Sequence, residues 1–109
     1  MIDKLFIDDE RFPPQTPEWD CVIVRNYDEA CEYMETFGCP MFISFDHDLG
    51  EGKNGYDIAK WMIERDLDME GNFIPFEFEY YVHSQNVCGK INIERMLDNY
   101  ISYKSQSSH

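Results

Sequence analysis

The sequence MFISFDHDLG at residues 41–50 decides the fold of this chain. Its first five residues are nearly all apolar, and aromatic or β-branched side chains dominate, which is typical of a strand buried on both faces of a parallel sheet. The charged side chains begin where this apolar run stops, with Asp46 and Asp48 on either side of His47. This arrangement predicts a central strand that delivers carboxylates to its C-terminal end.

Two other apolar runs end in the same way. Lys4–Ile7 stops at the Asp pair of residues 8–9, and Phe76–Val82 stops at the His-Ser pair of residues 83–84. Aromatic residues alternate with glutamates in the second run, which favours a half-exposed edge strand. If the three runs are parallel neighbours, their polar ends meet at the edge where open α/β sheets bind ligands.

Amphipathic segments separate these strands along the chain. An apolar stripe at helical spacing predicts a helix that Asn26 caps and Gly38 ends. A second helix is expected over about 56–65, and a last helix with Asn92 as its cap. A further short strand is expected at Cys21–Val24.

Strands that alternate with helices indicate an α/β fold, here a single-domain, doubly wound parallel sheet of about four strands over residues 1–104. The sequence FPPQTP at residues 12–17 contains three prolines. Since proline fixes φ and removes a backbone donor, a loop is expected in place of the first crossover helix. Residues 105–109 are expected to form a frayed tail.

The composition restricts the partners. The chain has 109 residues and a net charge of −13, which repels nucleic acid backbones and anionic membranes over any broad surface. A phosphate-bearing nucleotide or RNA end is compatible with a small site at which a cation covers the carboxylates. The four cysteines show no C-x-x-C spacing, which argues against structural zinc. Without a signal peptide or long apolar run, a cytoplasmic location and no membrane partner are expected, and the oligomeric state stays open.

The carboxylates at the strand ends favour a divalent cation. Residues two apart on a strand share a face at about 7 Å, so Asp46 and Asp48 can hold one cation between them. At a strand end the chain turns, and Asp8 and Asp9 can approach the same ion. We expect Asp8, Asp9 and Asp46 as metal ligands, with Mg²⁺ favoured and Mn²⁺ or Ca²⁺ as alternatives because the donors are hard oxygens. A solvated acidic turn is the competing interpretation.

Histidines near these carboxylates indicate proton transfer, because imidazole titrates near neutral pH. The expected catalytic residues are His47, His83 and Asp48. A glycine-containing loop before a helix can bind an anion through its backbone amides, and an arginine can bind a phosphate in a fork. The expected phosphate-binding residues are Arg11, Ser84, Asn86, Gly89, Lys90 and Asn92. A structural histidine and an ordinary loop are the competing interpretations.

Four motifs, taken together and in this order, resemble the cyclic-phosphate-processing receiver domains. They are DDxRxPP at residues 8–14, DHDLG at 46–50, GYD at 55–57 and HSxNxxGxxN at 83–92, and they span nearly the whole chain. The resemblance implies a receiver-like (flavodoxin-like) fold and an activity on cyclic phosphates, often at RNA ends.

The same resemblance assigns roles to single residues. It implies that Asp8 and Asp9 match the acidic pair that binds metal in receivers, that Asp46 or Asp48 takes the position of the phosphoacceptor, and that Ser84 takes that of the phosphate-sensing hydroxyl. The chain departs from an ordinary receiver after Ser84, because one last helix and no further strand with its lysine is expected there. It also has Val87 where the family usually has proline.

Several functions agree with these features. The first is a metal-dependent phosphoesterase, a phosphodiesterase-type hydrolase acting on a cyclic or terminal phosphate of a nucleotide or RNA end. The second is a non-catalytic receiver-like module that binds phosphate or a phosphorylated ligand in signalling. An acidic protein-binding adaptor is a third, and Asp46-x-Asp48 is also faintly similar to the motif of haloacid-dehalogenase-type phosphatases.

Overall fold

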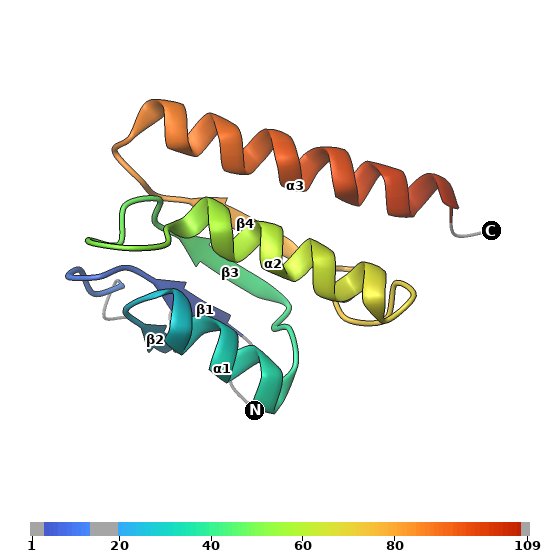
Figure 1. Cartoon of the computed structure of the whole chain (residues 1–109), viewed down its shortest axis with the longest axis horizontal. Helices are drawn as coiled ribbons and strands as arrows, with labels where there is room; N and C mark the ends of the chain where they lie inside the picture. Colours follow the sequence, from blue (N-terminus) through green and yellow to red (C-terminus); the bar gives the residue numbers. More distant parts are fainter. Residues whose placement is uncertain (1–3, 14–19, 108–109) are drawn as a thin grey trace.

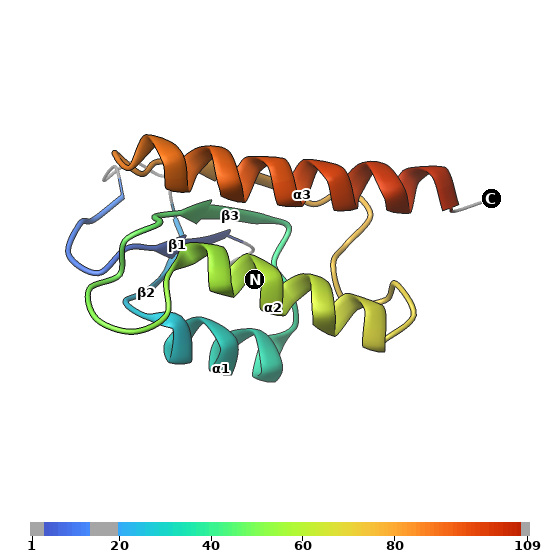
Figure 2. The same ribbon diagram turned by 45° about the horizontal axis from the view of Figure 1, so that its top comes forward.

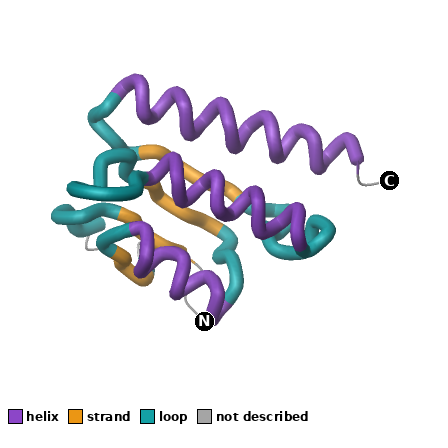
Figure 3. Tube along the Cα trace, in the orientation of Figure 1, coloured by secondary structure: helices purple, strands orange, loops and turns teal. Residues whose placement is uncertain are grey.

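The structure, a computed structural model, describes residues 4–13 and 20–107. Among the described residues, the second, third and fourth strands are each followed by a helix, whereas the first is followed by the second strand (Figures 1 and 3). The strands are β1 (Lys4–Ile7), β2 (Val22–Val24), β3 (Phe42–Phe45) and β4 (Glu79–Val82). The helices are α1 (Tyr27–Phe37), α2 (Gly55–Asp68) and α3 (Val87–Ser107).

All of these strands are parallel, in the order β2-β1-β3-β4. The sheet therefore extends to both sides of β1, with β2 on one side and β3 and β4 on the other, as in a doubly wound receiver-like sheet. Ile7 pairs with Phe45, and Phe45 pairs with Val82, so the last residues of β1, β3 and β4 are in register. Because of this register, the segments after the three strands begin side by side at one edge of the sheet.

The core lies between the sheet and the helices. α1 and α2 pack on one face of the sheet, and α3 lies beside α2 along the β4 edge (Figures 1 and 2). Ile7, Ile43 and Phe45 in the strands and Ile58 and Met62 in α2 are completely buried there. The apolar stripes predicted for these segments thus form the interface that holds the strand ends in place. No helix in the described part of the chain is long and apolar enough to cross a membrane.

The fourth strand is shorter than expected. β4 is an edge strand, as its alternating pattern predicted, but residues 76–78 precede it in a turn. The amide of Phe78 donates to the carbonyl of Pro75, and Phe76 is exposed. Pro75 fixes its own φ and begins this turn. Phe76 and Phe78 therefore keep the alternating sequence pattern of a strand but do not pair with β3.

The last helix begins earlier than expected. α3 starts at Val87, and Asn86 precedes it as a cap whose Oδ1 accepts from the amide of Gly89. Asn92 is therefore inside the helix, and the expectation that Asn92 caps it is wrong. Residues 105–107, expected in a frayed tail, belong to α3, and residues 108–109 lie outside the described residues. The expected proline loop falls largely on residues 14–19, which also lie outside them.

Gly55 is the point at which α2 approaches the end of β3. Its amide donates to the carbonyl of His47 at 2.8 Å, and a Cβ built on Gly55 would overlap the backbone carbonyl of Asp46. The absence of a side chain at residue 55 therefore sets how closely the helix holds the segment that carries Asp46.

We predict that Gly55→Ala lowers the free energy of unfolding by about 2–3 kcal/mol, because a methyl group there must push α2 away from β3. Chemical denaturation measures this loss. Gly52→Ala is the control, because a methyl group at Gly52 meets no other atom. Its positive φ of 92° makes the control sensitive only to backbone strain. A loss for Gly55→Ala no larger than that for Gly52→Ala would contradict the tight approach.

A buried carboxylate organises the opposite end of the molecule. Asp66 in α2 is completely buried, and its Oδ1 accepts from the amides of Phe73 and Ile74. Its Oδ2 accepts from the hydroxyl of Tyr100 and lies 3.1 Å from Nζ of Lys104. Asp66 therefore joins α2, the loop that follows it and α3.

Candidate functional site

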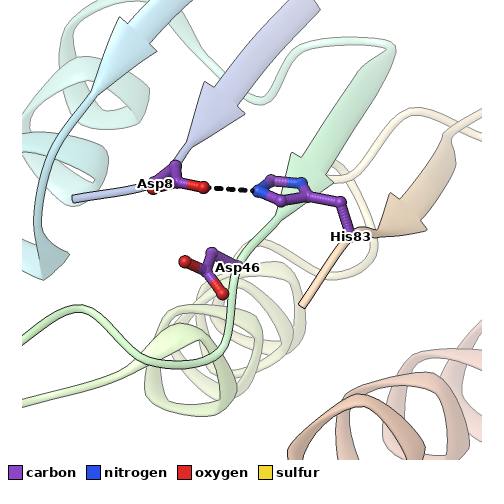
Figure 4. A group of neighbouring side chains, drawn as sticks. All are labelled: Asp8, Asp46 and His83. Carbon is purple, nitrogen blue, oxygen red and sulfur yellow. Dashed lines mark hydrogen bonds and ion pairs between the residues drawn. The ribbon is translucent and has the colours of Figure 1, made fainter. Parts of the chain in front are cut away.

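Asp8, Asp46 and His83 come together at the C-terminal edge of the sheet. They follow β1, β3 and β4 directly, and one potential ligand atom of each lies within 4.8 Å of the others. Figure 4 shows the imidazole of His83 directed toward the carboxylate of Asp8, with the carboxylate of Asp46 next to them. The convergence expected from the sequence is therefore present for these side chains.

Asp8 is completely buried and fully engaged in hydrogen bonds. Its Oδ1 accepts from the amides of Glu10 and Arg11, each at 2.9 Å, and its Oδ2 lies 3.0 Å from Nε2 of His83. Burial acts to raise the pKa of Asp8, but the two amides and the imidazole outweigh it, so the pKa lies below its ordinary value. Asp8 is thus a carboxylate at neutral pH despite its burial.

The pKa of Asp46 is shifted in the opposite direction, above its ordinary value. Burial raises the pKa of this carboxyl group, and the negative charge of Asp8 raises it further, while a hydrogen bond with Ser84 lowers it. Two carboxylates in close contact without a counter-charge destabilise the folded state when both are ionised. A bound cation would remove this repulsion.

His83 is held from three sides. Its Nδ1 lies 2.7 Å from the hydroxyl of Ser44, its Nε2 lies against Asp8, and its ring stacks on Phe6 at 4.6 Å with an angle of 4°. Because Asp8 is ionised and accepts, Nε2 carries the proton and Nδ1 accepts from Ser44. His83 therefore orients Asp8. The role of Ser44 was missed, although it is the one polar residue in the apolar run 41–45.

His47, Asp48 and Asn86 form a second cluster. Nδ1 of His47 lies 2.9 Å from Oδ1 of Asp48, and the side-chain amide of Asn86 donates to the same carboxylate at 3.3 Å. Hydrogen bonds from His47 and Asn86 lower the pKa of Asp48, so Asp48 is ionised and Nδ1 carries the proton. This tautomer leaves Nε2 of His47 as an acceptor, and Nε2 has no hydrogen-bond partner among the described residues.

A cleft of about 340 Å³ opens over the carboxylates. Seven of the residues expected at the site line it, and Glu10, Gly50 and Gln85 complete the lining without having been expected there. The seven are Asp8, Asp9, Asp46, Asp48, Arg11, Ser84 and Asn86. Gly50 has a φ of 78° and passes close to the carboxylate of Asp9, which explains the glycine in the DHDLG motif.

Asp46 and Asp48 do not form the strand pair that was expected. β3 ends at Phe45, so both carboxylates follow the strand and are not part of it. A carboxylate oxygen of Asp46 lies within 4.8 Å of one of Asp8, whereas Asp48 is exposed and held by His47 and Asn86. The expectation that Asp46 and Asp48 share a strand face is therefore wrong, while both residues line the same cleft.

The structure does not bring Gly89, Lys90 and Asn92 to the cleft. They lie within α3 and not in a loop, so the expected anion loop is absent from this part of the described chain. The imidazole of His47 packs directly on Gly89, where a Cβ would overlap it. Nζ of Lys90 lies 5.8 Å from the ring centre of Tyr81, and Asn92 lines a different cleft.

The donor set fits a hard divalent cation. Asp8, Asp9 and Asp46 line the cleft with carboxylate groups, and oxygen donors are those that Mg²⁺, Mn²⁺ and Ca²⁺ prefer. His83 lies in the same cluster as Asp8 and Asp46. Both of its ring nitrogens are already engaged, since Nε2 donates to Asp8 and Nδ1 accepts from Ser44. The Asp-Asp-His cluster could thus hold a metal through its oxygens.

Comparison with known proteins agrees with this geometry. The family model for the cyclic-phosphate processing receiver domain matches residues 3–99. No curated protein matches the chain. No solved structure matches it either. The family match covers all strands of the sheet and every side chain of the carboxylate cleft, so the chain belongs to the family of cyclic-phosphate processing receiver domains.

Proposed function

We propose that this protein is a metal-dependent phosphoesterase that opens a cyclic phosphate, or removes a terminal phosphate, on a nucleotide or RNA end. The observation that carries the proposal is the meeting of Asp8, Asp46 and His83 within 4.8 Å at the ends of β1, β3 and β4. In a chain of the cyclic-phosphate processing family, this cluster lies beside an imidazole with an available nitrogen.

Asp8, Asp9 and Asp46 would hold the cation, with Mg²⁺ favoured and Mn²⁺ or Ca²⁺ as alternatives. Such a cation polarises a phosphoryl oxygen and lowers the pKa of a bound water. His83 supports this role from behind, because its hydrogen bonds to Asp8 and Ser44 fix the carboxylate in one orientation.

The phosphate would lie in the cleft between the cation ligands and the β4–α3 connection. Ser84 and Asn86 line the cleft from that side, and Arg11 lines it from the segment after β1. Arg11 can form a fork to two phosphate oxygens, and the Ser84 hydroxyl can donate to a third. These side chains favour a phosphate dianion or diester, which the carboxylates alone would repel.

His47 is the group that we propose transfers the proton. In ring opening, the oxygen of water forms a bond to phosphorus and a bond from phosphorus to a ribose oxygen breaks. Nε2 of His47 accepts the proton that leaves the water, and the same proton is returned to the ribose oxygen. Asp48 holds the tautomer in which Nε2 is free to accept and stabilises the imidazolium.

Turnover of 2′,3′-cyclic nucleotides by the homogeneous protein with Mg²⁺ or Mn²⁺ tests the proposal. We expect His47→Ala to lower the rate constant by about 10²–10⁴-fold, which is the usual contribution of a positioned acid–base group. Asp48→Asn is expected to cost less, because the imidazole stays in place. Absence of turnover in the wild type with either metal would contradict the proposal, and so would a rate that both substitutions leave unchanged.

A non-catalytic module that accepts or binds phosphate is the second candidate. The contact between Asp46 and Ser84 favours it, because a carboxylate after a central strand beside a hydroxyl resembles the phosphoacceptor site of receivers. Against phosphotransfer, no lysine lines the cleft in the described part of the chain. Under this alternative, acetyl phosphate or a beryllofluoride mimic changes the NMR signals around Asp46 while cyclic nucleotides are not turned over.

A further inference from the structure

A second cleft, of about 540 Å³, lies next to the carboxylate cleft. Asn54 and Tyr56 at the start of α2 form one wall, and residues between 92 and 99 of α3 form the other. Figure 1 shows that these two helices run side by side. Apart from His47, the residues that line the cleft come from the first turn of α2 with its cap and from the middle of α3. Of the residues with a role in the proposed reaction, His47 lines this cleft, and the other lining residues have no role in the phosphate site proposed above.

The chemistry of the second cleft differs from that of the surrounding surface. The chain has 22 acidic residues, yet no carboxylate is among the residues that line this cleft. Asn54, Asn92 and Asn99 supply amide groups, Arg95 supplies a positive charge, and Tyr56 supplies an aromatic ring. Amides provide donors and acceptors together, which suits the edge of a nucleobase, and an aromatic ring suits its face.

His47 joins the two clefts. Its imidazole lines the second cleft, while its Nδ1 is bonded to Asp48, which lines the first. Asn86 also lines the first cleft and contacts both His47 and Asp48. The two clefts therefore meet at His47, which lines the second, and at Asp48 and Asn86, which line the first and contact His47.

We propose that the cleft between α2 and α3 binds the nucleoside part of the substrate, its base and ribose, while the phosphate lies over the carboxylates. This inference rests on the proposed function for the position of the phosphate. It assigns Asn92 to nucleoside recognition, although the sequence pattern placed it at the phosphate. It also explains why Gly89 is required, since His47 can stand between the clefts only where α3 has no side chain.

Arg95→Gln and Asn92→Ala test the assignment, because both residues are exposed on α3 and their replacement leaves the core intact. The probes are adenosine 2′,3′-cyclic phosphate and inorganic phosphate, each titrated by calorimetry in the presence of Mg²⁺. We expect each substitution to weaken binding of the cyclic nucleotide about tenfold and to leave inorganic phosphate unchanged. Lys60→Gln, which removes an exposed positive charge from α2 outside the cleft, is the matched control and should change neither affinity.

Equal losses for the cyclic nucleotide and inorganic phosphate in Arg95→Gln would overturn the assignment, and so would unchanged affinities in both variants. Titration of adenosine without phosphate, followed by the side-chain amide signals of Asn92 and Asn99, separates this inference from the proposed function. Shifts of these signals support the nucleoside site even if no cyclic phosphate is turned over. Cyclic nucleotide turnover by the wild type with no shift of these signals overturns the nucleoside site and leaves the phosphoesterase intact.

Discussion

Asp46→Asn is expected to lower divalent cation affinity by more than about 100-fold and to remove turnover that depends on the cation. Loss of a residue that only hydrogen-bonds to a metal ligand costs about 10–100-fold in metal affinity. Removal of the ligand itself should cost more. Loss of the several kcal/mol that a metal contributes to the transition state corresponds to a rate decrease of more than about 100-fold. Calorimetric titration with Mg²⁺ or Mn²⁺ and a turnover assay measure the two effects.

The same substitution is expected to stabilise the metal-free protein. The pKa of Asp46 is raised by burial and by the charge of Asp8. A folded-state pKa above the unfolded value means that the ionised carboxylate is less favourable in the folded state, so its charge lowers stability at neutral pH. We therefore expect a higher melting temperature for Asp46→Asn without metal, together with loss of the stabilisation that added metal gives the wild type.

Asp68→Asn is the matched control, because it makes the same change in charge at an exposed residue. Asp68 is the last residue of α2, whereas Asp46 lies near the first residue of that helix, Gly55. It should change neither cation affinity nor turnover. Asp46→Asn with wild-type cation affinity, or with a lower melting temperature than the wild type in the absence of metal, would contradict the account of this carboxylate.

Asp66→Ala is expected to lower the free energy of unfolding by about 3–5 kcal/mol, the usual cost of removing one partner from a buried ion pair. The substitution leaves the amides of Phe73 and Ile74 without their acceptor and removes the partner of Lys104. Asp66→Asn keeps an oxygen for the two amides, so its cost should be smaller. Urea denaturation measures both changes, and the exposed neighbour Asp68→Ala is the control.

The stabilisation by Asp66 should depend on pH in one direction. Burial acts to raise the pKa of Asp66, but hydrogen bonds from Tyr100 and from the amides of Ile74 and Phe73, with that of Lys104, lower it below the ordinary value. Its contribution is thus complete above the unfolded pKa of about 3.9 and is lost as the pH falls through the lower folded-state pKa. The wild type and Asp66→Ala should therefore converge in stability in acid. A difference between them that is the same at pH 7 and in acid would contradict this assignment.

Much of the sheet could be predicted because its strands are short apolar runs with clear ends. Lys4–Ile7 was predicted with its observed bounds, and the predicted central strand differs from β3 by one residue. The C-terminal edge followed from parallel pairing, which is why Asp8, Asp46 and His83 could be expected to meet. A pattern read along the chain does determine which residues end each strand.

Other features depend on contacts between distant residues. Asn86 and Asn92 are equally good caps by residue type, and in the structure Asn86 is the cap, while Gly89 in the first turn packs against His47. The pairing of Asp66 with Lys104 spans more than thirty residues and leaves no periodic signal. The cleft between α2 and α3 was also not predictable, because it requires the packing of two helices.

The most direct test of the central claim is the position of a bound cation. Mn²⁺ broadens the NMR signals of nearby amides, and substoichiometric Mn²⁺ can be added to the isotopically labelled protein. Amides that follow β1, β3 and β4, at residues 8–10, 46–48 and 83–85, should broaden first and together, and Asp46→Asn should abolish the effect. Broadening spread over the acidic surface of α1 and α2, with the three strand ends unaffected, would contradict a shared site for the cation at the end of the sheet.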